Sequence, residues 1–290
     1  MGNGYNNLQL SSNMKSRYLY ILFFVLSSVI PLSGQTFFSD STNRKTLLWT
    51  ATLSGGFNLN QHNAEFSGLP GVPSCCPNYL DGNGSGFSLG AKFSIPVNRT
   101  MFAEMRLGFS SLNGIMTALQ TQTIDDNGLA TGVFEHKIDT RISVLTFEPT
   151  ASFVVFNSLL LYGGLSLGAV TSATYTQTET LLSPSDVVFE NDTRVRNRFS
   201  DKISQVPVLQ AGLTAGLTYT IPLSNDGSLC AIPEIAYTLG LTNVVSTNDT
   251  WKINTLRFGL GVSYNFLKSP PLGTTIQQDS PSENRLPTKR

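Results

Sequence analysis

The sequence predicts an all-β chain that forms an eight-stranded antiparallel up-and-down transmembrane β-barrel. Three observations support this fold class. Apolar and polar residues alternate with a period of two in the segments that look ordered, and a helical period of 3.6 is convincing in none of them. The connections alternate between long and short. Charged residues make up only 13% of the 290 residues, about half of the ~25% usual in soluble domains.

The first four expected strands each have one apolar side and one polar side. They cover 49–59, 87–95, 103–110 and the cleaner part, 144–155, of a segment that begins near 133. Their apolar sides carry, in order, Leu53 and Phe57, Leu89 and Phe93, Met105 and Leu107, and Leu145 and Phe147. Pro149 interrupts the fourth strand, where we expect a bulge or a bend because proline cannot donate a ladder hydrogen bond.

The remaining four expected strands repeat the pattern. They cover 159–169, 209–221, 229–240 and 256–266. Their apolar sides carry, in order, Leu161 and Leu165, Leu213 and Leu217, Ile235 and Tyr237, and Phe258 and Leu260. Aromatic residues near the strand ends, among them Trp49, Tyr162 and Trp251, are candidates for the two aromatic girdles of a membrane barrel.

The connections predict which end of the barrel faces outward. Long loops are expected near 60–84, 111–132, 175–205 and 243–250, and tight turns at 97–100, 156–158 and 224–227. Long extracellular loops and short periplasmic turns are typical of outer-membrane barrels. An additional hairpin within 111–141 would raise the strand count to ten.

The polar side of the strands holds glycine, serine, threonine and a few charges, so we expect the apolar side to face lipid. A soluble barrel would bury its apolar side and carry many charges outside. The interior charges are then Lys92, Glu104, Arg106, Glu148, Glu234 and Arg257. Because isolated charges in a narrow lumen are costly, these six should form ion pairs. They would serve either as a polar core or as the lining of a narrow channel for ions or small solutes.

The chain divides into three parts. Residues 1–34 are expected to hold an N-terminal extension and a signal peptide, because Lys15 and Arg17 precede an apolar core at 18–30 and a small-residue exit at Gly34. A start at Met14 would give a complete signal without the extension. Residues 45–266 form the barrel, and the polar, proline-rich segment 267–290 is expected to be a disordered periplasmic tail. The expected location is the outer membrane.

No other group of residues predicts a chemical activity. Cys75 and Cys76 are adjacent and are candidates for a loop disulfide, with Cys230 as the third cysteine. His62 and His136 have no acidic or nucleophilic partner that spacing would select. We therefore expect no enzyme, no metal and no cofactor. With 19 basic and 19 acidic residues the chain has no net charge to attract nucleic acid.

Four segments resemble a known family. The loop FSGLPGVPSCCPNY (66–79) and the strands GSGFSLGAKFSIP (84–96), LYGGLSLG (161–168) and LRFGLGVSYNF (256–266) are similar to the N-terminal β-barrel of OmpA-family outer-membrane proteins of the Bacteroidetes and Chlorobi lineage. The resemblance covers residues 45–266. It implies outer-membrane lipid and lipopolysaccharide as surroundings, and Phe266 resembles the closing aromatic that the barrel-assembly machinery reads. Many relatives continue into a peptidoglycan-binding domain, and we expect none in this sequence.

The expected function is that of a structural outer-membrane barrel with long extracellular loops. Two alternatives remain at this point. One is the narrow channel, and the other is surface recognition or adhesion through the loops, of which 175–205 carries charges of both signs. The sequence does not indicate an oligomeric state.

Overall fold

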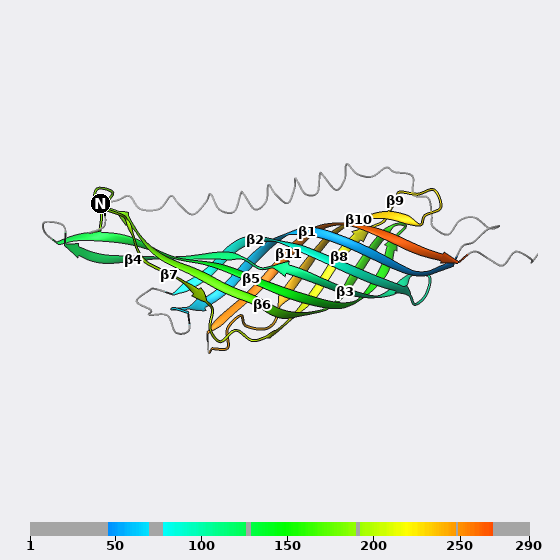
Figure 1. Ribbon diagram of the computed structural model, residues 1–290, viewed down its shortest axis with the longest axis horizontal. Helices are drawn as coiled ribbons and strands as arrows, with labels where there is room; N and C mark the ends of the chain where they lie inside the picture. Colours follow the sequence, from blue (N-terminus) through cyan, green and yellow to red (C-terminus); the bar gives the residue numbers. More distant parts are fainter. Residues whose placement is uncertain (1–45, 70–77, 126–128, 190–191, 248, 269–290) are drawn as a thin grey trace, which may run out of the picture. The chain divides into compact units, whose positions relative to one another are not determined.

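The computed structural model describes residues 46–69, 78–125, 129–189, 192–247 and 249–268, and these form strands, turns and loops without a helix. The strands are β1 (Thr46–Phe66), β2 (Tyr79–Pro96), β3 (Met101–Ser111), β4 (Gly114–Asp125), β5 (Leu129–Phe156), β6 (Leu159–Ser183), β7 (Val195–Lys202), β8 (Leu209–Tyr219), β9 (Ile221–Pro222), β10 (Leu229–Gly240) and β11 (Thr250–Lys268) (Figure 1). Accordingly, the described part of the chain has no helix that could cross a membrane.

Eight of these strands close into a ring. β1 pairs with β2 and with β11, and the ring continues through β3, β5, β6, β8 and β10 back to β11, with every pairing antiparallel. Each ring strand pairs with the ring strand that follows it in the chain. The prediction of an eight-stranded antiparallel up-and-down barrel is confirmed.

Three strands lie outside the ring. β4 pairs with β5 along its whole length but with β2 only at Gly82 and Asn83, so it lies beyond the end of β3. β7 pairs with the second half of β6, and β9 pairs with Cys230 and Ala231 at the start of β10. The additional hairpin that the sequence allowed within 111–141 is therefore present. It does not join the ring, so the ring has eight strands and not ten.

The outer side of the ring carries a belt of exposed apolar side chains. Every ring strand contributes to it, and members include Leu53, Phe57, Leu89, Leu107, Leu145, Leu161, Leu213, Tyr237, Phe258 and Leu260. Leu213, Phe258 and Leu260 are 46%, 38% and 62% exposed. A soluble protein rarely leaves so large a continuous apolar surface exposed.

Three of the four segments expected to be long loops, 60–84, 111–132 and 175–205, are partly strands, and for these the expectation was wrong, whereas the segment near 243–250 connects β10 and β11 as expected. β1 continues to Phe66, β2 already begins at Tyr79, and β6 runs to Ser183 before β7 pairs back onto it. β4, β5, β6 and β7 extend together beyond the other strands (Figure 1). In β1 and β5 the alternation continues there with the opposite polarity, because polar residues now face outward and apolar residues face inward, whereas β4 still exposes Ile115 and Leu119.

β5 shows this reversal along a single strand. In its second half Leu145, Phe147 and Phe153 face outward and Glu148 and Ser152 are buried inside. In its first half the outward positions are Glu135, Lys137, Asp139 and Arg141, and the buried positions are Phe134, Ile138 and Ile142. The change falls near Ser143. β1 changes in the same way after Leu59, where Gln61, Asn63 and Glu65 face outward and Ala64 and Phe66 are buried.

The inward apolar residues of this end form one cluster. It includes Phe66, Leu69, Tyr79, Met116, Ile138, Ile142, Tyr175, Val244, Val245, Trp251 and Ile253. We call this group the outer cluster. Val244 and Val245 come from the β10–β11 connection, which the hydrogen bond from Val244 N to Trp251 O, 2.7 Å long, folds inward. Trp251, expected in an aromatic girdle, is instead fully buried in the outer cluster.

Candidate functional site

The six charged residues that the sequence predicts for the lumen come from five strands. Lys92 lies on β2, Glu104 and Arg106 on β3, Glu148 on β5, Glu234 on β10 and Arg257 on β11. They are the charged residues of the strand segments that carry the apolar belt, and their side chains are between 3% and 13% exposed. We call this group the lumen network.

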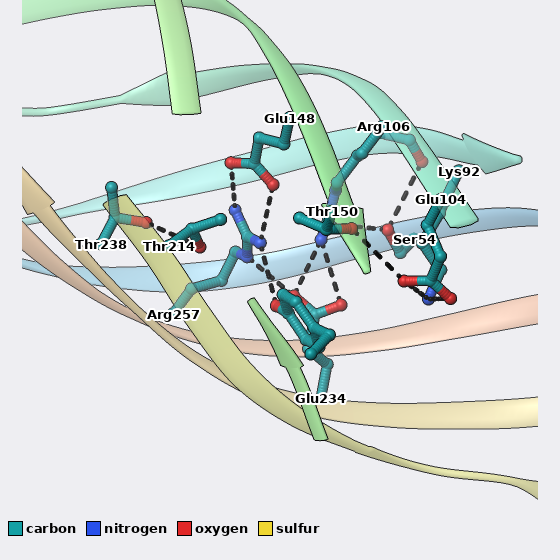
Figure 2. A network of polar contacts seen from close by, with 12 residues as sticks. Ser54, Lys92, Glu104, Arg106, Glu148, Thr150, Thr214, Glu234, Thr238 and Arg257 are labelled. Carbon is teal, nitrogen blue, oxygen red and sulfur yellow. Dashed lines mark hydrogen bonds and ion pairs between the residues drawn. The ribbon is translucent and has the colours of Figure 1, made fainter. Parts of the chain in front are cut away.

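Arg257 is the centre of the lumen network. Its Nη1 and Nη2 donate to the two oxygens of Glu148 at 3.2 Å each, and its Nε donates to Glu234 Oε1 at 2.9 Å. Figure 2 shows the guanidinium of Arg257 between these two carboxylates. The arrangement with Glu148 is the bidentate one, which is the strongest form of an arginine–carboxylate pair. Arg257 therefore joins β11 through its side chain to β5, with which β11 has no backbone pairing, and adds a side-chain contact to its neighbour β10.

Arg106 binds Glu234 from the other side. Its Nη1 donates to both oxygens of Glu234, at 2.8 and 3.0 Å, and its Nη2 donates to Ser54 Oγ at 2.8 Å. Tyr162 completes the shell, because its hydroxyl donates to Glu234 Oε1 at 3.1 Å and accepts from Arg257 Nη2 at 3.4 Å. Glu234 thus accepts hydrogen bonds from two arginines and a tyrosine.

Lys92 and Glu104 form a second part of the lumen network (Figure 2). Lys92 Nζ lies 3.3 Å from Glu104 Oε1, and Ser94 Oγ donates to the same oxygen at 3.1 Å. Thr150 Oγ1 donates to Glu104 Oε2 at 3.5 Å. Three cations and three carboxylates are thereby neutralised within one lumen. Removal of one member would leave an opposite charge buried without a partner, which costs far more than the pair itself contributes.

Sequence reasoning did not identify the uncharged side chains that bind the lumen network, of which Tyr162 is the largest. Tyr162, expected in a girdle, is 5% exposed and points into the lumen. An added Cβ at Gly216 would lie 2.7 Å from its hydroxyl, so Tyr162 lies directly over Gly216 of the neighbouring strand. The sequence did carry a signal for Tyr162, because it alternates with the outward Leu161 and is followed by Gly163 and Gly164.

A second polar cluster lies in the extended sheet beyond the belt. Glu179 on β6 accepts hydrogen bonds from Arg196 at 2.6 Å and from Asn197, both on β7. Burial disfavours the charged carboxylate, but these hydrogen bonds outweigh it and keep the pKa of Glu179 below its usual value. The guanidinium of Arg196 lies 4.8 Å from the ring centres of both Phe134 and Phe189. The cluster holds β7 against β6.

His136 lies directly opposite Glu179 in the β5–β6 pairing. A histidine beside a carboxylate is the kind of pair that a hydrolytic site would require, and spacing in the sequence did not reveal it. Here His136 is 1% exposed and Glu179 is already bound by Arg196 and Asn197. Burial is also the main cause of the lowered pKa of His136. The pair is part of the packing between the extended strands.

The remaining predicted site residues lie elsewhere. Cys75 and Cys76 lie outside the described residues, and Cys230 is a free, buried thiol. Phe266 lies on the outer side of β11 and stacks on Trp49 with a ring-centre distance of 3.4 Å. β11 continues to Lys268, two residues past the expected end of the barrel. Within the described ranges, no three His, Cys, Asp or Glu side chains are grouped as metal ligands would be.

No family model and no curated protein matches the sequence. Solved structures do resemble its fold. The attachment invasion locus protein Ail of Yersinia pestis, in complex with a heparin analogue, is 13% identical with a TM-score of 0.33, and the match covers 75% of this chain and 100% of Ail. The outer-membrane protease OmpT of Escherichia coli is 10% identical with a TM-score of 0.34, covering 79% and 100%. The outer-membrane protein OprG of Pseudomonas aeruginosa is 14% identical with a TM-score of 0.32, covering 76% and 97%.

OmpT and OprG are outer-membrane proteins by their descriptions, and a second structure of Ail describes it as one too. At such identities and TM-scores they assign no function to this chain. The barrel assignment rests on the strand pairing of the chain itself, and what the barrel does has to be argued from the lumen network, the apolar belt and the extended sheet.

Proposed function

We propose that this chain is an outer-membrane β-barrel protein whose lumen is closed by a paired polar network, and that its role is structural. The observation that carries the proposal is the reversal of polarity along β5. The same side of the strand changes from Arg141 and Asp139 to Leu145 and Phe147. A soluble protein gains nothing from such a change, whereas a strand that leaves a bilayer must make it at the interface.

The dimensions of the belt support the same proposal. β3 and β8 have 11 residues each and β10 has 12, which is close to the 9–11 residues that a tilted strand needs to cross the hydrocarbon. Ring closure leaves no strand edge exposed to lipid, where an unpaired backbone group would be costly. The polar lumen replaces the apolar core of a soluble barrel.

The closed lumen favours a structural role over a channel. The lumen network fills the belt region, and the outer cluster fills the end beyond it with Trp251, Met116 and Phe66. Two hollows of about 480 and 380 Å³ lie mainly among outward-facing residues of the sheet. Eight strands make a barrel that side chains can fill completely.

Export, the lipid surroundings and assembly of the barrel are proposed from the sequence. We infer that residues 1–34 direct export, that lipid and lipopolysaccharide surround the belt, and that Phe266 takes part in recognition by the assembly machinery. The similarity to OmpA-family barrels of the Bacteroidetes and Chlorobi type remains part of this proposal. We assign no enzymatic role, because the His136–Glu179 pair is buried and engaged.

Cell fractionation combined with gel mobility tests the proposal. The protein should appear in the outer-membrane fraction and migrate differently before and after boiling, as a folded barrel does. Leu213→Arg should weaken insertion by about 2–4 kcal/mol, since it places a charge on the lipid-facing side of the belt. Thr117→Arg, on the outward face of β4 beyond the belt, is the matched control and should insert normally. A soluble periplasmic protein with unchanged mobility would refute the membrane assignment.

A further inference from the structure

An apolar groove crosses the belt near the seam of the barrel. It has a volume of about 480 Å³, and its floor is formed by the small residues Ala51 of β1 and Ala91 of β2. Its walls include Leu53, Phe93, Val262 and Tyr264. Ala51 is paired with Phe93 on one side and with Tyr264 on the other, so the small side chain lies between two large ones. The groove lies in the half of the belt nearest the tight turns.

An aromatic group closes one end of the groove. Trp49 stacks on Phe266 and lies 5.2 Å from Phe93, measured between ring centres, and Tyr264 meets Phe266 edge to face at 4.8 Å. Trp and Tyr are the residues that prefer the level of lipid ester and head groups. This rim therefore marks the point where an acyl chain in the groove would give way to its polar head.

A cation follows on the same side of the same strand. Val262, Tyr264, Phe266 and Lys268 are successive outward positions of β11, and Lys268 is exposed. Lys268 is four residues from Tyr264, or about 13 Å along the strand. The apolar groove, the aromatic rim and Lys268 thus follow one another along the outer side of the barrel. Their order matches that of the acyl chain, the ester region and the phosphate of a phospholipid.

We propose that this line is a binding site for one anionic phospholipid of the periplasmic leaflet, with an acyl chain over Ala51 and Ala91 and the phosphate at Lys268. The inference rests on the proposed membrane location. The charge supports this assignment, since a juxtamembrane lysine attracts anionic head groups. Lipid is the occupant we assign, and a second copy of the chain is a competing outcome of the test.

Tryptophan fluorescence offers a direct test. The chain has two tryptophans, and Trp251 is fully buried in the outer cluster while Trp49 lies at the rim of the groove. The folded full-length protein is reconstituted in phosphatidylcholine vesicles that contain phosphatidylglycerol brominated on its acyl chains. Bromine quenches tryptophan on contact, so the loss of fluorescence reports which lipid occupies the site beside Trp49. In Trp49→Phe the quenching should disappear.

The expected result is a preference of about fivefold for the anionic lipid over phosphatidylcholine, the size of one lysine–head group attraction. Lys268→Gln should reduce this preference to about one. Ala91→Phe, which fills the groove, should remove the preference while Ala215→Phe, on the lipid-facing side of β8, should leave it unchanged. Gel mobility before and after boiling shows that each variant is folded.

Three outcomes would overturn the inference. Equal quenching by anionic and zwitterionic lipid in the wild type would remove the site but leave the membrane proposal intact. Cross-linked dimers that Ala91→Phe abolishes would assign the groove to a second copy. If neither brominated lipid quenches Trp49, the belt does not face lipid, and the proposed function fails together with the site.

Discussion

At the scale of single residues, Arg257 holds the lumen network together, because one guanidinium binds Glu148 and Glu234 at once. Arg257→Met keeps much of the volume but leaves Glu148 without its cation. We expect the free energy of unfolding to fall by about 3–5 kcal/mol, which is the usual cost of an uncompensated buried charge. Urea titration followed by gel mobility of the folded band measures the loss.

The control for this prediction is a double-mutant cycle. Adding Glu148→Gln to Arg257→Met removes the unpaired carboxylate, so the double variant should be more stable than Arg257→Met alone. If the effects of the two substitutions simply add, the 3.2 Å contacts between these side chains contribute no coupling, and the lumen network is not the polar core that we propose.

His62 gives a pH-dependent prediction. It lies beyond the belt, fully buried, and Trp251 Nε1 donates to its Nδ1 at 3.1 Å. Burial lowers its pKa to about 4, against ~6.5 in the unfolded chain. Between these values the unfolded state binds more protons, so the free energy of unfolding decreases as the pH falls from about 6.5 to about 4. The largest loss from this group is about 3 kcal/mol, and it is absent above pH 7.

His62→Gln tests this pH dependence. The glutamine carbonyl can accept the same hydrogen bond from Trp251 but does not titrate. When the pH is lowered from 7 to 5, the free energy of unfolding should decrease less in the variant than in the wild type. Urea unfolding at the two pH values measures the difference. His136→Gln should also reduce the pH slope, since the pKa of His136 is lowered as well, and the chain has no third histidine that could contribute. An unchanged pH slope in His62→Gln would show that the pKa of His62 is the same in the folded and the unfolded protein, which would contradict the prediction.

At the scale of elements, the β6–β8 pairing depends on a glycine. Gly216 lies opposite Tyr162, and an added Cβ would lie 2.6 Å from Ile235 O and 2.7 Å from the Tyr162 hydroxyl. Gly216→Ala should therefore push Tyr162 away from Glu234 and Arg257 and cost about 1–3 kcal/mol, as overpacking does. Urea unfolding measures the effect.

Gly163 of β6 is the matched control for Gly216. A Cβ there would meet only Thr214 O, at an ordinary 3.7 Å. Gly163→Ala should change the free energy of unfolding little, or raise it by a few tenths of a kcal/mol because alanine restricts the unfolded chain. Equal losses at the two positions would mean that the contact between Gly216 and Tyr162 does not matter.

The elements also show what a sequence can predict. The eight ring strands were predictable because the bilayer imposes one strict rule on the belt, apolar outside and polar inside. The same rule put Lys92 and Arg257 on the inner side. Outside the belt the rule reverses, so β4 and the first half of β5 read as polar loops. In β6 the register also shifts near Thr171, between the pairs of Ser143 and Val144, which moves the inward positions from even to odd numbers. Alternation counted from the belt cannot anticipate such a shift.

At the scale of the whole molecule, two barriers lie in series along the lumen. The lumen network fills the belt, and the outer cluster, with Trp251 fully buried, fills the end beyond it. Removal of one barrier leaves the other in place. We therefore expect that neither the wild type nor Arg257→Ala nor Glu104→Ala conducts ions in a planar bilayer, even though each alanine opens space among the buried charges.

This prediction separates the structural role from the channel. If the lumen were a narrow ion path, the wild type would show a steady conductance, and Arg257→Ala would change its size or its ion selectivity because a charge at the constriction is lost. Gel mobility of the reconstituted samples shows whether the protein is folded, so that an absence of conductance can be assigned to a folded barrel. The apolar outer cluster is the decisive feature, because ions cross an apolar constriction only when water fills it. A pore would need both barriers to open, whereas a structural barrel needs both to remain packed.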